Sequence, residues 1–598
     1  MRFPSINALY ERARTVMLRF PWPLLAGAVA ATAAIIASDA ANPVHEELWI
    51  RLCLVAMLGI PLTFAVTMLA EQRQWPGIIR TIVLAACIVA LYWFFWTWPG
   101  PEQKHLQIRY LQLSAAIHLA VAFLPFWRRP EGRSFWQYNR RLFEGFLRAV
   151  LFSGVLFVGL AIALGALDKL FGVDVEGETY IRLWFVIAFV INTWIFLAGV
   201  PEDLAELEGS EGYPRALKVF TQYILTPLVA VYLVILTAYL VKIVVTGTWP
   251  SGWIGYLVSS VGAVGLLGFL LVHPLRRNEN EAWIRTYSRL LFIGLIPAAV
   301  MFLLALWKRV EPYGLTELRF LGLLLGSWLL GIALLYTVRR DMGIRIIPIS
   351  LAVILLLTAF GPLGSTGISV RSQADRIREI MRSNGVGLIE STSAQSPDLP
   401  NEDLREMSEA LRFLLERNAI GTIRGIFGET VGNAVRAFDP DEYGEVDSAA
   451  ALVMRSAGLE YVTRYGYQPA DYFAVERQVD GRAIAISGYD YAVALAGQNS
   501  TRVVVGQDTL RVTSDSARMR IEVRRASGDT LLAFELRPMV DTLFAMEPAK
   551  RSALPLELSA EGSQVRGMLA LAWLSAERRD GVIKVTAWRG DLYLRFVN

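Results

Sequence analysis

The sequence predicts an α-helical multi-pass membrane bundle of about eleven spans, followed by a soluble C-terminal α+β domain in which helices precede a β-sandwich or small barrel. Roughly the first 60% of the chain is a series of apolar stretches, each near the ~20 residues that a helix needs to cross a bilayer. Of the 598 residues, 54% are hydrophobic, which is high for a soluble protein. The bilayer satisfies such helices one at a time, whereas a soluble fold would have to bury all of them together.

The apolar stretches define a transmembrane domain over residues 23–364, preceded by a cytoplasmic N-terminal segment, residues 1–22. No secretory signal peptide is expected, because the basic start lacks a short apolar region with a cleavage site. The predicted spans are Pro23–Ala40, Leu48–Ala70, Gly77–Trp98, Ile108–Trp127, Leu142–Leu167, Tyr180–Val200, Leu217–Val245, Trp253–Val272, Tyr287–Trp307, Leu318–Val338 and Ile344–Gly361.

The basic residues between the spans predict the orientation. Lys and Arg are more than twice as frequent in the segments on the N-terminal side as in those on the other side. Because basic residues stay on the cytoplasmic side, the N-terminus is expected on the cytoplasmic side of a bacterial inner membrane. An odd number of spans then places everything after Ser365 outside the cytoplasm.

Few ionisable residues lie deep in the spans. Asp and Glu occur only near span ends, which disfavours a proton-coupled carrier, and His118 is the one deep titratable group. Together with Asn192 and Gln222 it forms a candidate intramembrane polar site. The alternative is that these side chains only form hydrogen bonds between helices.

Glycines and prolines suggest how the spans pack and bend. Gly262, Gly265 and Gly268 give the eighth span a smooth face for close packing. Several spans are interrupted by prolines, namely Pro61, Pro125, Pro227, Pro297 and Pro348. Proline favours a kink, which is a feature of transporters but is also common in other membrane helices.

Two segments carry a family resemblance. The loop after the ninth span reads Arg309-Val310-Glu311-Pro312-Tyr313-Gly314-Leu315-Thr316-Glu317-Leu318-Arg319, and the last span ends Gly361-Pro362 before Ser369-Val370-Arg371-Ser372-Gln373. Both resemble the bacterial membrane-protein family catalogued as domain of unknown function 4153, over the membrane region and the start of the tail. The resemblance implies a multi-pass inner-membrane protein and brings no activity, cofactor or catalytic residue with it.

The loop itself has two interpretations. Gly314 provides a tight turn, Tyr313 an interfacial anchor, and Thr316 a cap for the tenth helix with Glu317 in its first turn. Alternatively, Arg309, Tyr313, Glu317 and Arg319 form a polar site at the outer mouth of the bundle.

The tail divides into a short helix and linker (365–400), a helical subdomain (401–470) and a β-rich extracytoplasmic domain (471–598). The helices expected there cover Ser372–Asn384, closed by Gly385, then a helix from Asn401 and one over Ile420–Phe427. The predicted strands are Arg482–Ile486, Arg502–Val505, Thr509–Val512, Met519–Val523, Leu531–Leu536, Met568–Leu574, Val582–Thr586 and Leu592–Val597.

No catalytic set is evident. The tail has neither His nor Cys, and Cys53 and Cys87 both lie inside spans, so no catalytic residue, metal, disulfide or cofactor is predicted. The net charge of +4 is too small to indicate a nucleic-acid partner.

These features favour a non-enzymatic integral membrane protein in contact with the lipid bilayer. Its extracytoplasmic domain would bind an envelope protein or glycan, in a sensor or assembly role. The alternative is a transporter or lipid-handling permease that uses the kinked helices, and a membrane enzyme ranks third. The sequence specifies neither a ligand nor an oligomeric state.

Overall fold

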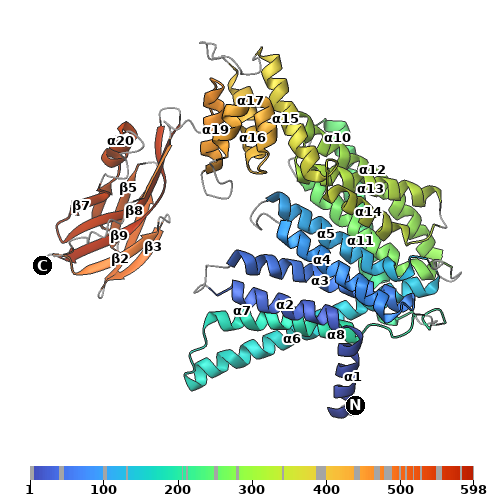
Figure 1. The fold of residues 1–598 in the computed structure, drawn as a ribbon. Coiled ribbons are helices and arrows are strands. Elements are labelled where there is room, and N and C mark those ends of the chain that lie inside the picture. Colours follow the sequence, from blue (N-terminus) through green and yellow to red (C-terminus); the bar gives the residue numbers. More distant parts are fainter. Residues whose placement is uncertain are drawn as a thin grey trace. The chain divides into compact units, whose positions relative to one another are not determined.

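The computed structural model describes residues 6–39, 46–97, 104–128, 132–204, 206–209, 213–247, 253–277, 282–339, 342–385, 399–436, 445–462, 472–476, 486, 488–496, 500–505, 508–515, 518–525, 528–546, 555–579 and 582–596. The chain forms two compact units, one of Met1–Gln395 with Ala410–Ala457 and one of Ser396–Glu409 with Gly458–Asn598. The boundary between them crosses helix α16 (Asn401–Leu415). The first unit is helical, and the second carries all the described strands (Figure 1).

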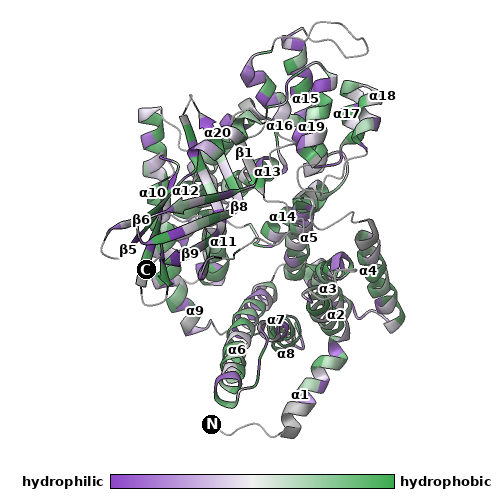
Figure 2. Ribbon diagram, turned by 90° about the vertical axis from the view of Figure 1, so that its left-hand side faces the viewer, coloured by the Kyte–Doolittle hydropathy of each residue, from purple (hydrophilic) through white to green (hydrophobic). Residues whose placement is uncertain are grey.

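Within the described residues, nine helical segments are long and apolar enough to cross a membrane, or up to ten if a bent helix pair is one span. Their residues are mostly hydrophobic (Figure 2). The nine are α3 (Glu46–Gln72), α4 (Gly77–Thr97), α5 (Lys104–Phe123), α6 (Arg133–Phe171), the run α7 (Gly177–Phe185), η3 (Val186–Ile191) and α8 (Asn192–Ala198), the run α9 (Arg215–Phe220), η4 (Thr221–Leu225) and α10 (Thr226–Thr246), α11 (Trp253–Val272), α12 (Ala282–Tyr313) and α13 (Glu317–Val338).

The other two predicted spans are also helical but shorter than expected. The first corresponds to α2 (Pro21–Ala37), which makes a bend of 96° with the preceding helix α1 (Ile6–Arg19). The last corresponds to α14 (Ile346–Ala359), only 14 residues long. All eleven segments are therefore helices, whereas nine or ten of them count as spans by length and composition. Pro21 starts a new helix at the bend, since proline is accepted in the first turn but not inside a helix.

The glycine face of α11 allows close packing, as predicted. A Cβ atom on Gly262 would lie 2.9 Å from Leu329 of α13, and one on Gly265 would lie 2.8 Å from Leu291 of α12. One on Gly268 would lie 2.9 Å from the Tyr287 hydroxyl. Larger side chains would push these helices apart.

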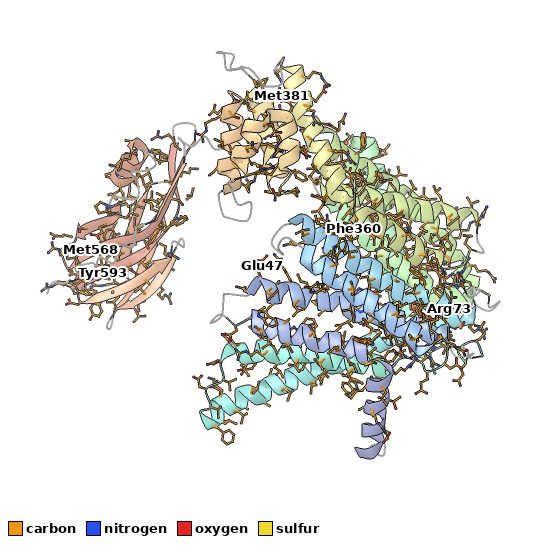
Figure 3. The ribbon with its side chains drawn as sticks, in the orientation of Figure 1. Glu47, Arg73, Phe360, Met381, Met568 and Tyr593 are labelled. Carbon is orange, nitrogen blue, oxygen red and sulfur yellow. The ribbon has the colours of Figure 1, made fainter. Side chains whose placement is uncertain are left out.

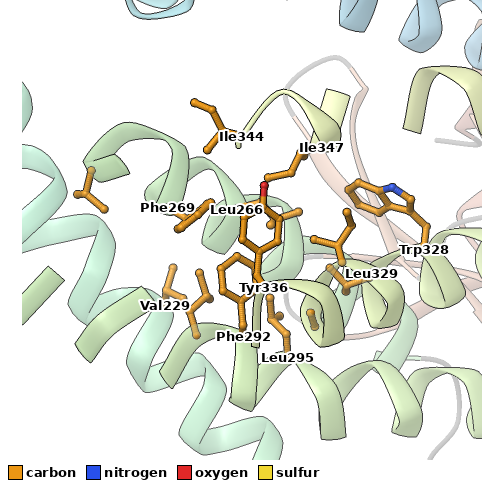
Figure 4. Packing of buried hydrophobic residues seen from close by; sticks show 14 of the residues in the cluster. Val229, Leu266, Phe269, Phe292, Leu295, Trp328, Leu329, Tyr336, Ile344 and Ile347 are labelled. Atoms are coloured by element: carbon orange, nitrogen blue, oxygen red, sulfur yellow. The ribbon is translucent and has the colours of Figure 1, made fainter. Parts of the chain in front are cut away.

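Aromatic rings fill the same region of the core (Figure 4). The ring centroids of Phe269 and Phe292 are 4.8 Å apart, and Tyr336 stacks on Phe292, also at 4.8 Å. Such pairs add to the stability from buried area alone. Helices α11, α12 and α13 therefore meet in one continuous apolar core.

Of the helices predicted after the membrane region, the first begins earlier than expected and the other two begin where expected. α15 spans Ser365–Ser383, because Gly361 takes φ +74° and turns the chain directly into a new helix. Gly385 follows the C-cap of α15 and adopts the left-handed conformation with φ +68°, so it ends the helix as expected. The predicted helices from Asn401 and over Ile420–Phe427 are present as α16 and α17, followed by α18 (Glu429–Val435) and α19 (Glu445–Ser456). Most of the predicted linker lies outside the described residues.

The second unit contains two antiparallel sheets. One has the strand order β1 (Tyr472–Glu476), β8 (Val565–Arg579), β9 (Val582–Phe596), β2 (Tyr491–Ala496), with β7 (Glu557–Glu561) also paired to β8. The other has the order β3 (Ser500–Val505), β4 (Asp508–Asp515), β5 (Arg520–Arg525), β6 (Thr530–Glu535). A short helix, α20 (Arg537–Ala545), follows β6.

Side chains of both sheets share one apolar core, so the arrangement is a sandwich. A Cβ on Gly567 of β8 would lie 2.5 Å from Leu532 of β6, which shows how closely the sheets approach. Five of the predicted strands match β3, β4, β5, β6 and β8, and the last two predicted strands form the single strand β9. The first, Arg482–Ile486, lies almost wholly outside the described residues.

Candidate functional site

The predicted outer-mouth residues surround the sharp turn between α12 and α13. α12 ends at Tyr313, and Gly314 has φ +64°, a backbone conformation that glycine adopts without a steric penalty. The Gly314 N–H donates to the Val310 carbonyl over 2.8 Å. α13 then begins at Glu317, so the turn places this glutamate in the first turn of a new helix.

Helix α15 holds the turn from the side. The Leu315 N–H donates to Ser372 Oγ over 2.9 Å, and Gln373 Nε2 donates to the carbonyls of Tyr313 and Leu315, both over 3.1 Å. A Cβ atom on Gly314 would lie 2.6 Å from that nitrogen. The loop motif and the Ser-Gln motif of the family resemblance thus lie in direct contact.

Glu317 makes a buried ion pair with a residue of the helical subdomain. Arg417 Nε donates to Oε1 over 2.8 Å, and Arg417 Nη2 donates to Oε2 over 3.1 Å. The Glu317 side chain is 1% exposed and the Arg417 side chain is 7% exposed. Two parallel charge-assisted hydrogen bonds are the strongest arrangement that a guanidinium and a carboxylate can make.

Arg417 has further partners. Its Nη1 lies 2.8 Å from Glu416 Oε2, and the guanidinium carbon lies 3.6 Å from the centre of the Phe413 ring. These contacts and the Glu317 pair occupy all three nitrogens and one face of the guanidinium. The pair therefore fixes two parts of the first unit to each other.

The other predicted members of the outer-mouth site are placed differently. Arg319 Nη1 donates to the carbonyls of Tyr313 and Gly314 over 3.0 Å and 2.8 Å, and its guanidinium lies over the Tyr313 ring. Arg309 is exposed, and the structure gives it no hydrogen bond or ion pair with any residue that it describes.

Three of the four predicted residues therefore meet at the turn, while Arg309 stands apart. Sequence reasoning missed Arg417 altogether, and it quoted Gln373 only as part of a motif. Arg417 lies 100 residues from Glu317, and no local pattern links the two. The one available signal was a glutamate at the start of an apolar helix.

The capping prediction for Thr316 was only half right. Thr316 occupies the N-cap position of α13, but its side chain makes no capping hydrogen bond. Its carbonyl accepts the Phe320 N–H over 2.8 Å, the ordinary first bond of a helix. The Glu317 side chain turns instead to Arg417.

Among the intramembrane candidates, His118 is exposed on α5. Its Nδ1 lies 2.8 Å from the Ser114 carbonyl of the same helix. The expected hydrogen bond to a neighbouring helix is therefore replaced by one within the helix.

Asn192 and Gln222 lie at two segments of π-helix. η3 ends directly before Asn192, and η4 contains Gln222. Pro227 explains η4, because it lacks the N–H that would donate to the Tyr223 carbonyl in an α-helix. In the described part of the chain, no hydrogen bond joins His118, Asn192 and Gln222. The elements that carry them, α5, α8 and η4, pack mainly against neighbouring helices and not against one another.

The described residues contain no group of three or more His, Cys, Asp and Glu side chains placed to hold a metal ion. Cys53 and Cys87 are both free. The groups at the turn are paired with one another, so the arrangement is suited to joining segments of the chain.

Comparisons with known proteins find a matching family and a distant relative. The uncharacterized protein PM1469 of Pasteurella multocida (strain Pm70) is 21% identical over 328 residues, which is 54% of this chain and 54% of that protein. The chain thus matches about half the length of this relative. No solved structure matches the chain. The family model described as "Domain of unknown function (DUF4153)" matches residues 24–396, and the chain belongs to this family.

Proposed function

We propose that this chain is a non-enzymatic integral membrane protein whose region after the last apolar helix binds a partner of the cell envelope, in a sensor or assembly role. The observation that carries the proposal is the buried pair of Glu317 with Arg417. Its two charge-assisted hydrogen bonds join the helical region after the last apolar helix to α13. A rigid attachment of this kind suits a protein that presents a binding domain at a membrane.

The β-rich unit offers a surface for such a partner. Among the strands that the structure describes, β3 lies at the end of the four-stranded sheet and pairs only with β4. Val503 and Val505 point into the core, whereas Val504 is 71% exposed. An exposed apolar residue on an end strand favours an extended peptide that adds to the sheet, so a protein segment is preferred over a glycan.

Photo-crosslinking in intact cells tests this proposal. A photoreactive amino acid at Val504 is expected to yield one discrete protein adduct. The same residue at Arg537, exposed on α20 of the same unit, serves as the control and is expected to yield none. Equal adducts at both positions, or none at Val504, would contradict the proposed surface.

The domain is proposed to lie outside the cytoplasm. The support is the excess of Lys and Arg on the N-terminal side of the spans. Alkaline phosphatase fused at the C-terminus should be active, and a fluorescent protein that cannot fold after export should stay dark when fused there. The opposite pair of results would place the partner in the cytoplasm.

A transporter is the second candidate, favoured by the π-helical segments beside Asn192 and around Gln222. Such segments often lie at functional sites in helices. Asn192→Ala should then abolish function in a protein that still folds, whereas a partner-binding protein should tolerate it. Changes on β3 should have the opposite pattern.

A further inference from the structure

A cavity of about 360 Å³ lies among the first membrane helices. Its walls come from α3, α4, α5 and the residue after α14, Phe360, which Figure 3 labels. Leu58, Leu106 and Leu113 form its buried side. The volume falls within the range of about 300 to 1,000 Å³ found for small-molecule sites.

One charged group lines this otherwise apolar cavity. Arg109 lies near the start of α5, and its guanidinium lies 5.6 Å from the centre of the Phe360 ring. The Nε atom of Arg109 is buried and has no hydrogen-bond partner among the described residues. An unpaired buried donor is costly, so this N–H favours a ligand that brings an acceptor.

The shape of the cavity suits a lipid chain. Arg109 and Ile117 are eight residues apart along α5, or about 12 Å at a rise of 1.5 Å per residue. A single leaflet has about 15 Å of hydrocarbon. Trp93 of α4 lines the cavity and is 66% exposed, so the cavity is open on the side where lipid surrounds the helices.

We infer that this cavity binds one acyl chain of an anionic phospholipid from the surrounding bilayer, with the lipid phosphate paired to Arg109. A guanidinium matches phosphate oxygens with two parallel hydrogen bonds, and Nε would supply one of them. The apolar walls hold the chain. The occupant enters sideways past Trp93.

Native mass spectrometry of the full chain in neutral detergent tests this inference. The purified protein is titrated with phosphatidylglycerol, phosphatidylcholine or oleate. Phosphatidylglycerol is expected to bind with a stoichiometry of one and at least about tenfold more tightly than phosphatidylcholine. Oleate-specific binding would overturn the phospholipid assignment, and equal binding of both phospholipids would overturn the role of Arg109.

Three variants complete the test. Arg109→Gln should lower the affinity for phosphatidylglycerol at least about tenfold. Ala90→Trp, which fills the cavity from the exposed side of α4, should abolish binding of the acyl chain without altering the charge of the protein. Arg309→Gln removes the same charge from an exposed site and should bind like the unaltered protein.

A thermal midpoint measured for each variant separates lost binding from lost folding. If Arg109→Gln fails to fold, Ala90→Trp still decides the question. Unchanged phosphatidylglycerol binding in a folded Ala90→Trp variant would refute the inference.

Discussion

Breaking the buried pair of Glu317 and Arg417 should release the helices that follow the membrane region. The Glu317 carboxylate is 1% exposed, and Arg417→Met removes both of its hydrogen bonds to the guanidinium. An uncompensated buried charge costs about 3 to 5 kcal/mol. We therefore expect the local free energy of unfolding of α16 and α17 to fall by at least about 3 kcal/mol.

Glu317→Gln should cost less than Arg417→Met. The glutamine still offers one acceptor oxygen, and Arg417 retains Glu416 at 2.8 Å and the Phe413 ring. We expect a loss of about 1.5 to 3 kcal/mol, the value of one hydrogen bond to a charged group. In the double variant Glu317→Gln/Arg417→Met, no buried charge remains, so its cost should fall well short of the sum of the two.

Hydrogen exchange measured by mass spectrometry on peptides from α16 and α17 reports these changes. A loss of 3 kcal/mol accelerates exchange roughly 100-fold, since about 1.4 kcal/mol corresponds to a factor of ten. Arg378→Met is the matched control, because Arg378 pairs with the exposed Asp375 within helix α15. This variant should lower the free energy of unfolding by less than about 1 kcal/mol. Unchanged protection in Arg417→Met, or a larger effect of Glu317→Gln, would refute the reasoning.

Two further predictions concern the turn and the start of α6. Gly314→Ala should lower the free energy of unfolding by at least about 2 kcal/mol, because alanine would have to adopt the left-handed backbone and its Cβ would lie 2.6 Å from Gln373 Nε2. Gly385→Ala is the control: Gly385 has φ +68° but open space around it, so the loss should be about 1 kcal/mol in the same exchange measurement. The Ser134 backbone N–H, the Ser134 hydroxyl and the Arg133 N–H hold the pKa of Glu208 below its ordinary range. The resulting stabilisation of the α6 start is present above about pH 4.3 and is lost as the pH falls through the lower folded-state pKa. Pepsin cleavage near residue 133 should then accelerate with falling pH relative to a Glu208→Gln variant, and parallel profiles for the two proteins would contradict this.

The membrane helices could be predicted from sequence because apolar length is a local property. All eleven predicted segments are helical, and α17 was predicted to the residue. The count of spans was less certain, since α2 and α14 fall near the lower limit of length. Their ends depend on the local effects of Pro21, which starts α2, and of Gly361, which turns the chain after α14.

The strands were harder to predict where pairing overrides local signals. Arg589-Gly590-Asp591 interrupts the apolar pattern like a turn, which split β9 into two predicted strands. In the sheet, Gly590 pairs with Leu571, and a Cβ there would lie 2.4 Å from the Ala570 carbonyl. Close approach of β8 thus requires glycine within a continuous strand.

The sequence by itself determined that the chain is a multi-pass membrane protein with a β-rich tail, because hydrophobicity and its period act over neighbouring residues. Only the tertiary structure decided the partner of Glu317 and the contact between the two family motifs. Gln373 reaches the Tyr313–Leu315 turn across about 60 residues, and Arg417 reaches Glu317 across 100. Such contacts depend on how whole helices pack, and a pattern of neighbouring residues carries no information about them.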